Sequence, residues 1–368
     1  MPLFVGAISG TSIDGLDLAL VEIDDDQSQL VNAETVDFPM QLKSRLTELA
    51  GAQGDVVDIG RTSSALGSFI GKAINQFLKN SNVNPRNIRA IGSHGQTIHH
   101  FPRTAEAFSM QIGDGARIAE ISGIDTVVDF RSRDIAASGE GAPLVPLFHQ
   151  RLFQSNKSDR VVLNIGGIAN VTYLPRGASI GQRGFDTGPG NALIDAYVLR
   201  VLNCRYDDDG AIAASGVVVA ELFDRLYSDP WLRRFPPKST GKEHFNFEYV
   251  AKAIQSLELE PNPSDVVATL TEFTARTIAD AILQWCCNSG ELIVCGGGRL
   301  NSHVMQRLRD YLSDFNVFTS DSLGIDGDFV EAATFAYMAH LFVNRLHGND
   351  PQATGASGSR VLGCLYPA

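Results

Sequence analysis

The sequence predicts an α/β protein built from two domains with a cleft between them, and three observations lead to this expectation. The 368 residues exceed the size at which a single hydrophobic core keeps growing. Segments with the patterns of strands and helices alternate along the chain. A glycine-centred hairpin between two strand-like runs occurs twice, at residues 10–15 and again at 166–170. A cleft of this kind suits an enzyme with two substrates.

The first series of elements has the order strand, strand, strand, helix, strand. Three consecutive strands are expected over Leu3–Ile8, Leu18–Ile23 and Leu30–Phe38, because these runs have the composition of strands. A helix is expected over about 56–79 and a further strand over 88–93.

The second series repeats this plan without repeating the residues. Two strands, 161–165 and 171–173, flank the second hairpin. The later elements expected are helices at 192–202, 217–226, 264–287, 302–312 and 329–343 and strands at 291–295 and 361–366, with a long ordered loop at 228–246 and a polar linker at 347–359. We expect one domain over residues 1–130 plus about 355–368, and the other over 131–354.

The composition narrows the functional class. A net charge of −12 with no long basic run argues against a nucleic-acid partner. A mean hydropathy of −0.02, with no apolar run of membrane-spanning length and no basic leader segment, leads us to expect a cytoplasmic protein without membrane contact. The five cysteines form no Cys-x-x-Cys pair and the eight histidines show no metal-ligand spacing, so we expect reduced thiols and no zinc site.

The opening hairpin carries residue types that bind phosphate. Gly10 and Gly15 permit close backbone approach to a ligand, and Thr11–Ser12 offer hydroxyl and amide donors. Asp14 and Asp17 are carboxylates that can orient a hydrated magnesium ion. An ordinary turn rich in Gly, Ser and Asp is the alternative, although it would need none of the hydroxyls. The hairpin alone leaves both interpretations open.

Asp186 is the candidate catalytic carboxylate. The order of strand, turn and helix places it at a strand end, facing the N-terminus of the helix that begins near Asn191. A helix N-terminus favours negative charge, so the carboxylate should stay ionised and be able to accept a proton at neutral pH. The alternative is that Asp186 only caps this helix.

Eight motifs in a fixed order give the chain its resemblance to a known superfamily. They are Ser9–Asp17, Gly92–Thr97, Ile112–Gly115, Asp129–Asp134, Gly141–Pro146, Asn164–Asn170, Phe185–Asn191 and Cys295–Arg299. Together they resemble the actin-like ATPases, which include sugar kinases, hexokinases, Hsp70-type chaperones and actin, and more closely the anhydro-N-acetylmuramic acid kinase family. The resemblance covers nearly the whole chain. Ile8 and Ile13 stand where that family has methionines, and Ser138 and Glu140 where it has glycine and glutamine.

The resemblance implies two ribonuclease-H-like domains of the actin and hexokinase type, with mixed sheets that face a nucleotide cleft. It also implies ATP and Mg²⁺ as cofactors. The residues that match the family's phosphate and adenosine contacts are Gly10, Thr11, Ser12, Ile13, Asp14, Gly15, Leu16, Asp17, Gly166, Gly167, Asn170, Gly297 and Gly298. Asp14 would hold the metal ion through water, and Asp186 matches the family's catalytic aspartate.

The substrate implied by the resemblance is a small amino sugar, with Gln96, Thr97, Arg131 and Glu331 beside it. Arg131 suits the lactyl carboxylate of such a sugar, and a salt bridge between the domains is the alternative role. Water activated by Asp186 would open the 1,6-anhydro ring, and the freed O6 would take the γ-phosphoryl group of ATP. The product would be N-acetylmuramic acid 6-phosphate, formed in cell-wall recycling. The resemblance also implies a homodimer.

Three further residues have plainer expected roles. Lys238 and Lys242 lie in the 228–246 loop, where we expect them to be solvated rather than in contact with phosphate. His94 is expected to be a hydrogen-bonded turn residue.

Other classes of protein fit the motifs less well or stay open. A dinucleotide-dependent oxidoreductase would explain Gly296–Gly298 after a strand, but Asn301 stands where its fingerprint has the third glycine. A P-loop enzyme is disfavoured because neither Gly71-Lys72 nor Gly241-Lys242 is followed by Ser or Thr. An ordinary sugar kinase and an actin-like ATPase without a sugar substrate share the implied fold and remain alternatives.

Overall fold

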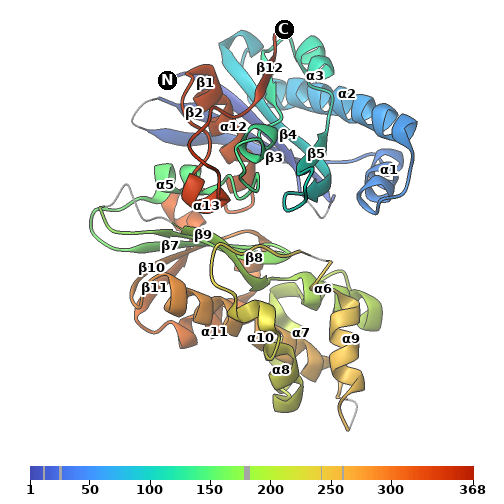
Figure 1. Ribbon diagram of the computed structural model, residues 1–368, viewed down its shortest axis with the longest axis vertical. Coiled ribbons are helices and arrows are strands. Elements are labelled where there is room, and N and C mark those ends of the chain that lie inside the picture. The colour runs from blue at the N-terminus through green and yellow to red at the C-terminus, as the bar shows by residue number, and fades with distance from the viewer. Residues whose placement is uncertain (11–12, 25–26, 178–182, 242, 259–260) are drawn as a thin grey trace. The chain divides into compact units, whose positions relative to one another are not determined.

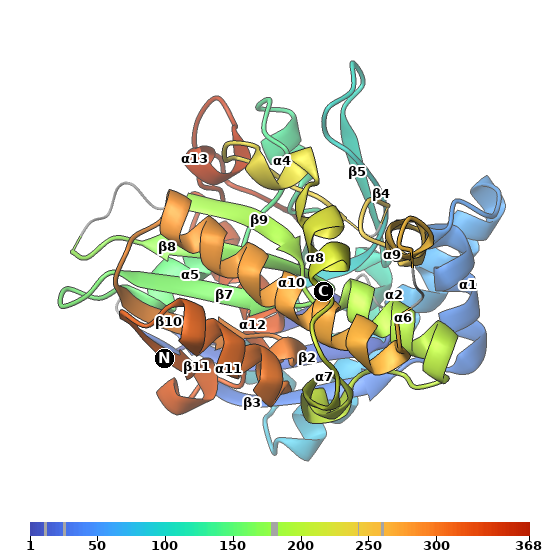
Figure 2. The same ribbon diagram turned by 90° about the horizontal axis from the view of Figure 1, so that it is seen from below.

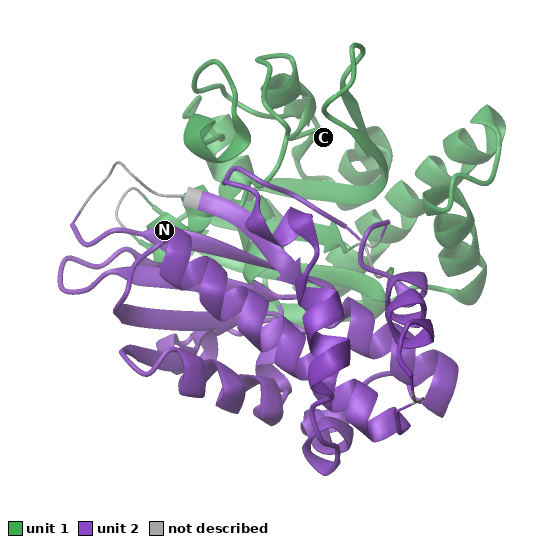
Figure 3. Cartoon of the chain, turned by 60° about the horizontal axis from the view of Figure 1, so that its bottom comes forward, with its two compact units in different colours: residues 1–152, 329–368 green, residues 153–328 purple. Residues whose placement is uncertain are grey.

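The computed structural model describes residues 1–368 except 11–12, 25–26, 178–182, 242 and 259–260. The chain forms two compact units, which we call unit 1 (residues 1–152 and 329–368) and unit 2 (residues 153–328) (Figure 3). Each unit is built around one mixed sheet.

The sheet of unit 1 has the strand order β12-β6-β4-β1-β2-β3, and β5 pairs with β4. Figure 1 labels the strands of this sheet except β6. Its strands are β1 (Leu3–Ser9), β2 (Gly15–Ile23), β3 (Ser28–Asp37), β4 (Ile88–Phe101), β5 (Phe108–Ile112), β6 (Thr126–Val128) and β12 (Cys364–Tyr366). β1 is antiparallel to β2 and parallel to β4, which in turn is parallel to β6. The chain therefore leaves β1 and β6 at the same edge of the sheet.

Helices cover both faces of this sheet. One apolar cluster joins Val5 and Ala7 of β1 to α1 (Met40–Ala50), α2 (Val56–Asn80) and α3 (Gly115–Ser122), and a second joins Phe4 and Ile8 to α12 (Val330–Val343). Successive side chains of a strand point to opposite faces, so a strand covered on both sides is apolar throughout. The shorter helices of this part of the chain are α4 (Ser132–Ile135), α5 (Pro146–Phe153) and α13 (Pro351–Thr354), with a 3₁₀ turn at Pro85–Asn87.

The sheet of unit 2 has the order β11-β10-β7-β8-β9. Its strands are β7 (Arg160–Ile165), β8 (Ile168–Leu174), β9 (Arg183–Pro189), β10 (Gly290–Cys295) and β11 (Phe315–Thr319). β7 is antiparallel to β8 and parallel to β10, and β10 is parallel to β11. α10 (Pro263–Trp285) and α11 (Ser302–Tyr311) lie against one face of this sheet (Figure 2).

The remaining helices of unit 2 form a second apolar cluster with α10. They are α6 (Ala192–Leu202), α7 (Ala211–Ser215), α8 (Ala220–Tyr227) and α9 (Phe247–Gln255). Short 3₁₀ turns occur at Asp208–Gly210, Pro230–Arg233, Gly297–Leu300 and Ser320–Leu323. The 228–246 loop connects α8 to α9 and contains only the second of these turns among its described residues.

The two sheets share one plan. In both, the first strand lies at the centre, with an antiparallel hairpin partner on one side and a parallel strand on the other. The predicted mixed α/β class and the repetition within the chain are thus confirmed. The structure also shows elements that were not predicted, which are α1, β5, α3, β6, α4, α5, α7, α9, β11 and α13. β4 continues to Phe101 rather than ending near residue 93.

The limits of the units differ from the limits expected from the sequence. The chain passes from unit 1 to unit 2 after residue 152, not 130, and returns after residue 328, not about 354. Segment 131–152 packs with unit 1 because Phe148 of α5 is in the same apolar cluster as α12. α12 belongs there because it lies so close to β1 that a Cβ on Gly6 would be 1.8 Å from the carbonyl oxygen of Ala332.

Candidate active site

The first group of predicted site residues lies at one edge of the sheet in unit 1. Ser9, the last residue of β1, is paired in register with Gln96 of β4. Its Oγ donates to Oε1 of Gln96 at 2.5 Å, and Thr97 Oγ1 accepts from Nε2 of Gln111 at 3.1 Å. Gln96 is buried, and its hydrogen bond with Ser9 joins β4 to the start of the first hairpin. The carboxyl ends of parallel strands are where α/β sheets bind ligands.

The first hairpin divides into buried and exposed residues. The side chains of Ile13 and Leu16 belong to the apolar cluster under α2, so only their backbone atoms can contact a ligand. Asp14 is exposed and lies 3.5 Å from Nζ of Lys43. Asp17 accepts a hydrogen bond from the hydroxyl of Thr35 at 2.6 Å. The predicted contacts at Thr11 and Ser12 lie outside the described residues.

Arg131 is held in place by neighbours in unit 1. Its Nε and Nη2 lie 3.1 and 2.9 Å from Nε2 of His94, and its Nη1 donates to the carbonyl oxygen of Gly141 at 2.8 Å. Nδ1 of His94 lies 3.1 Å from the carbonyl oxygen of Gly95, which can only accept, so Nδ1 carries the proton and Nε2 receives Arg131. Gly141 is fixed in turn by Asp134, whose Oδ2 accepts its N–H at 2.8 Å.

The electrostatics of this cluster agree with a neutral histidine beside a buried cation. Burial, and then the charge of Arg131, hold the pKa of His94 well below its usual value. Burial also lowers the pKa of Arg131 to about 10, against the opposing effect of Glu331 and Asp134. Arg131 therefore stays charged at neutral pH. Glu331, in the first turn of α12, acts on Arg131 electrostatically, so the structure brings these two predicted sugar contacts together.

The structure shows the conformation or contacts of the four positions that depart from the family pattern. Ser138 adopts φ 66°, a conformation in which glycine is the usual residue. Glu140 forms an ion pair with Arg103 at 2.7 Å. Ile8 and Ile13 are both buried in the apolar clusters of unit 1, where they pack as the methionines would.

The second group of predicted residues lies at the corresponding edge of the sheet in unit 2. Gly166 and Gly167 connect β7 to β8, and their carbonyl oxygens accept the N–H groups of Asn191, Gly190 and Ala192 at 2.8 to 3.0 Å. The second hairpin therefore receives the start of α6, for which Asn191 is the N-cap residue. Asn170 of β8 is paired in register with Asp186 of β9.

The predicted adenosine-side turn follows β10. Arg299 is buried and contacts three carboxylates, those of Asp321, Asp326 and Asp328, at 2.9, 3.0 and 2.5 Å. Burial lowers its pKa, but the hydrogen bonds with Asp328 and Asp321 outweigh this and raise the pKa above its usual value. Nη1 of Arg299 also donates to the carbonyl oxygen of Gly296 at 3.2 Å. The guanidinium of Arg299 thus stabilises the turn, and its charge is already paired with these carboxylates.

Two glycines in unit 2 are not required by the protein's own packing. A Cβ on Gly297 would meet no protein atom within 4 Å, and one on Gly166 would meet its nearest at 3.6 Å, an ordinary contact. Neither residue has a positive φ. Gly298, by contrast, has no room for a Cβ, because Cγ2 of Ile165 would lie 2.3 Å away. The open faces at Gly166 and Gly297 fit a ligand that approaches the backbone closely, as a nucleotide does.

Asp186 lies within β9, which continues to Pro189, and not at the strand end as expected. Its backbone N–H donates to the carbonyl oxygen of Lys238 at 3.0 Å, and its Oδ2 accepts the N–H of Thr240 at 2.9 Å. The cap of α6 is Asn191, so the alternative role of Asp186 as the N-cap residue is wrong. Its carboxylate is half-buried and oriented by the 228–246 loop.

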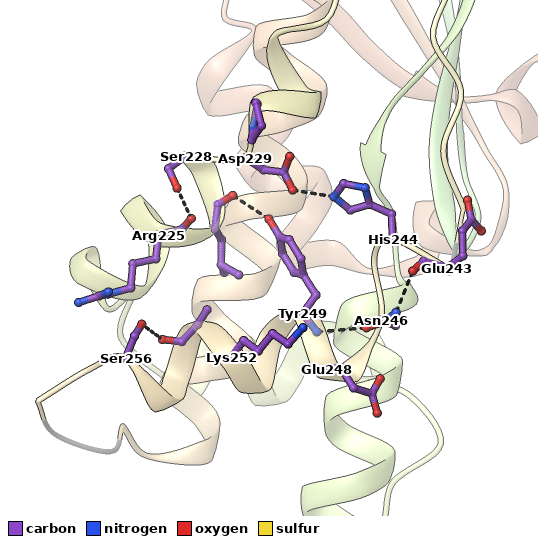
Figure 4. A pocket seen from close by; sticks show the side chains of 13 residues that line it. Arg225, Ser228, Asp229, Glu243, His244, Asn246, Glu248, Tyr249, Lys252 and Ser256 are labelled. Carbon is purple, nitrogen blue, oxygen red and sulfur yellow. Dashed lines mark hydrogen bonds and ion pairs between the residues drawn. The ribbon is translucent and has the colours of Figure 1, made fainter.

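A pocket of about 610 Å³ lies beside the 228–246 loop, between α8 and α9. Asp229 and His244 face each other at its rim, 2.6 Å apart, and Tyr249 donates to the carbonyl oxygen of Leu226 at 2.8 Å (Figure 4). None of the predicted site residues that the structure describes lines this pocket.

Comparisons with known proteins decide between the alternatives. A family model described as anhydro-N-acetylmuramic acid kinase matches residues 2–368. The chain belongs to the anhydro-N-acetylmuramic acid kinase family. It is 45% identical over 372 residues to the anhydro-N-acetylmuramic acid kinase of Xanthomonas axonopodis pv. citri (strain 306), covering 100% of this chain and 98% of that protein. It is 43% identical over 364 residues to the protein of the same name from Coxiella burnetii (strain Dugway 5J108-111), covering 99% and 97%.

Membership of the anhydro-N-acetylmuramic acid kinase family confirms the predicted family and the predicted enzyme class, a phosphotransferase. Among solved structures, the chain resembles an activator of the 2-hydroxyisocaproyl-CoA dehydratase from Clostridium difficile with bound ADPNP, with a TM-score of 0.48 and 10% identity over 93% of this chain and 96% of that one.

The sequence motifs did not reveal every contact around the predicted site residues. The contact of His94 with Arg131 was missed because the two residues are distant in the sequence, and Lys238 is buried where a solvated side chain was expected. The only local signal was the position of Lys238 between two prolines and a Ser-Thr pair, near Trp231. Within the described residues, no helix combines the length and apolarity needed to cross a bilayer, and no group of three or more His, Cys, Asp or Glu side chains could hold a metal ion.

Proposed function

We propose that the protein is an ATP-dependent kinase that opens the 1,6-anhydro ring of anhydro-N-acetylmuramic acid and phosphorylates O6, giving N-acetylmuramic acid 6-phosphate in peptidoglycan recycling. The family match over residues 2–368 carries this proposal. The geometry of both sheet edges supports it, because each presents predicted ligand-binding residues at the carboxyl ends of parallel strands. We also infer that the enzyme acts in the cytoplasm as a homodimer.

The phosphates of ATP would be bound by the backbone of the two hairpins, and the adenosine would lie against Gly297 and Gly298. The open faces of Gly166 and Gly297 fit a close approach of this kind. Asp14 suits a magnesium ion held through water, because its carboxylate is exposed. Mg²⁺ is commonly bound by one or two carboxylates together with substrate phosphates, and when bound it offsets the negative charge of the transferring phosphoryl group.

Asp186 would act as the general base. It takes a proton from the water that attacks the anomeric carbon, while the bond from that carbon to O6 breaks. The freed O6 then attacks the γ-phosphorus of ATP and ADP leaves. One water and one phosphoryl group are thus added to the sugar in a coupled reaction. The hydrogen bond from Thr240 to Oδ2 supports this role, because it orients the carboxylate on a rigid strand.

Arg131 would bind the lactyl carboxylate of the sugar. Its side chain is half-buried, stays charged, and is oriented by His94 and Gly141 before any ligand arrives. The partners that the structure gives it, His94, Gly141 and Glu331, belong to unit 1. Gln96, Thr97 and Glu331 lie around the same edge of that sheet.

The test is conversion of 1,6-anhydro-N-acetylmuramic acid in the presence of ATP and Mg²⁺, followed by mass spectrometry of the sugar. A product heavier by both water and a phosphoryl group is the expected result. Gain of the phosphoryl group alone would indicate an ordinary sugar kinase. No sugar product, with ATP hydrolysis unaffected by the sugar, would return the chain to an actin-like ATPase of another function.

A further inference from the structure

The 228–246 loop contacts the proposed base at two points. Asp186 donates its N–H to the carbonyl oxygen of Lys238, and Thr240 donates its N–H to the carboxylate of Asp186. β9 is the last strand in the order of its sheet, so Lys238–Thr240 pairs with its outer edge. We call Lys238–Thr240 the bracket. A shift of the bracket would necessarily turn the carboxylate that it holds.

Lys238 is buried, although its position in a long polar loop predicts a solvated side chain. It is 5% exposed, and its Nζ donates to the carbonyl oxygen of Leu232 at 2.8 Å. The same Nζ lies 4.5 Å from the ring centroid of Trp231, a distance at which a cation is attracted to an aromatic face. Burying an ammonium group costs free energy, so its presence at this place indicates that the charge has a role.

Trp231 joins the ammonium group to the bracket. Its Nε1 donates to the carbonyl oxygen of Ser239 at 3.3 Å, so one side chain contacts both Lys238 and the residue in the middle of the bracket. Trp231 is itself anchored, because its N–H donates to Asp229 at 2.8 Å and its ring packs edge-on against Phe245. Asp229 also pairs with His244 at the rim of the pocket in Figure 4.

We propose that Lys238 is a positioning residue for Asp186: its ammonium group, fixed beneath Trp231, sets the bracket in place and supplies positive charge beside the carboxylate. This inference rests on the proposed role of Asp186 as the base. Lys238 touches neither the sugar nor ATP in this scheme. It acts on the reaction only through Asp186, whose ionised and correctly oriented form it favours.

The burial of Lys238 also predicts a pH dependence. Burial lowers the pKa of Lys238 to about 8, against the opposing effect of Asp186. The ammonium group is therefore present below about pH 8 and is lost as the pH rises through that value. Turnover should fall on the alkaline side. In the described part of the chain, the titratable or charged groups near Trp231 and Leu232, which contact Lys238, are Asp229, His244, Arg233, Tyr227 and Asp280.

The test compares Lys238→Met with Lys238→Arg. We expect Lys238→Met to lower kcat roughly 10- to 100-fold, as loss of a group that orients a catalytic side chain commonly does, with KM for ATP within about 3-fold of the wild type. The acidic limb of its pH profile should move to higher pH, because Asp186 loses a neighbouring cation. Lys238→Arg keeps a charge that does not titrate, so it should retain more activity and lose the alkaline limb near pH 8. Lys252→Met, at an exposed lysine in α9, is the matched control.

A double variant separates positioning from a general structural role. In an Asp186→Asn background, Lys238→Met should have little further effect, because it acts through a group that is already gone. Effects that multiply would overturn the proposal, as would a Lys238→Met enzyme with wild-type turnover and pH profile. If Lys238→Met does not fold, the pH profiles of the wild type and Lys238→Arg are compared. An alkaline limb that persists in Lys238→Arg would overturn the proposal. If neither variant folds, a wild-type pH profile without a limb near pH 8 would overturn the proposal.

The failure of this proposal differs from the failure of the proposed function. A wild-type enzyme that yields no sugar product contradicts the function itself. A wild-type enzyme that adds water and a phosphoryl group, and that needs Asp186 but not Lys238, contradicts only the positioning role.

Discussion

The hairpin between β1 and β2 and the hairpin between β7 and β8 occupy the same place in two sheets of the same plan, yet they present different chemistry. The first exposes a carboxylate, Asp14, and buries Ile13 and Leu16 beneath it. The second uses the carbonyl oxygens of Gly166 and Gly167 to receive α6 and leaves an open face at Gly166. The same arrangement of strands therefore presents a charged side chain in unit 1 and a backbone that a ligand can approach closely in unit 2.

Near its predicted site residues each unit also has a cation whose pKa lies below its usual value, and these two cations differ in a way that matters. Arg131 in unit 1 has its pKa lowered by burial to about 10, and Lys238 in unit 2 to about 8. Arg131 remains charged over the whole physiological range, which suits a permanent carboxylate contact. Lys238 titrates close to that range, so only the site in unit 2 should respond to mild alkali. Variants at the two edges test this difference.

The largest effect is expected at the proposed base. Asp186→Asn should lower kcat about 10²- to 10⁴-fold, because an amide cannot accept the proton, while the hydrogen bond from Thr240 can still form to the amide oxygen. Nucleotide binding, measured by calorimetry with ADP, should be unchanged. Turnover close to that of the wild type would remove Asp186 from the mechanism and leave unit 2 with a binding role only.

The next largest effect is expected in the first hairpin. Asp14→Asn should weaken the apparent affinity for Mg²⁺ roughly 10- to 100-fold, because a carboxylate that orients metal-bound water contributes about that much. The measurement is kinase activity against Mg²⁺ concentration at saturating sugar. Asp17→Asn should have a smaller effect, since Oδ1 of Asp17 already accepts from the hydroxyl of Thr35. Equal Mg²⁺ responses in the two variants would contradict this division of roles.

The local pattern of the sequence predicted β1, β2, β7, β8 and β10 and the glycine turns of both edges. The helix expected over 192–202 and the strand expected over 291–295 agree with α6 and β10 to within one residue. The local pattern could not predict contacts between distant segments. Nothing near residue 330 indicates that α12 packs against β1, and nothing near Lys238 indicates that its loop contacts Asp186 of β9. Burial of a polar residue is decided by tertiary neighbours, which no local window contains.

Glycine substitutions separate ligand approach from packing. Gly297→Ala should leave stability unchanged or raise it by about 0.4–1 kcal/mol, since its Cβ meets no protein atom within 4 Å, but should raise KM for ATP about tenfold. Gly6→Ala is the contrasting control. Its Cβ would lie 1.8 Å from the carbonyl oxygen of Ala332, so unfolding should become easier by roughly 1–3 kcal/mol. Thermal unfolding and ATP saturation curves check both variants. A Gly297→Ala enzyme with normal KM for ATP would show that no nucleotide approaches there.

The smallest effect is expected at Lys43, the partner of Asp14. The two groups are 3.5 Å apart with side chains 42% and 65% exposed, so solvent and salt screen their attraction. Lys43→Met should therefore change the free energy of unfolding by no more than about 0.5 kcal/mol and KM for ATP by less than about twofold. If the Mg²⁺ response of Lys43→Met instead matched that of Asp14→Asn, the ion pair would be what positions Asp14. The carboxylate of the first hairpin would then need a neighbouring residue to orient it, as Asp186 needs the bracket. The two sheet edges would in that case differ only in their backbone contacts.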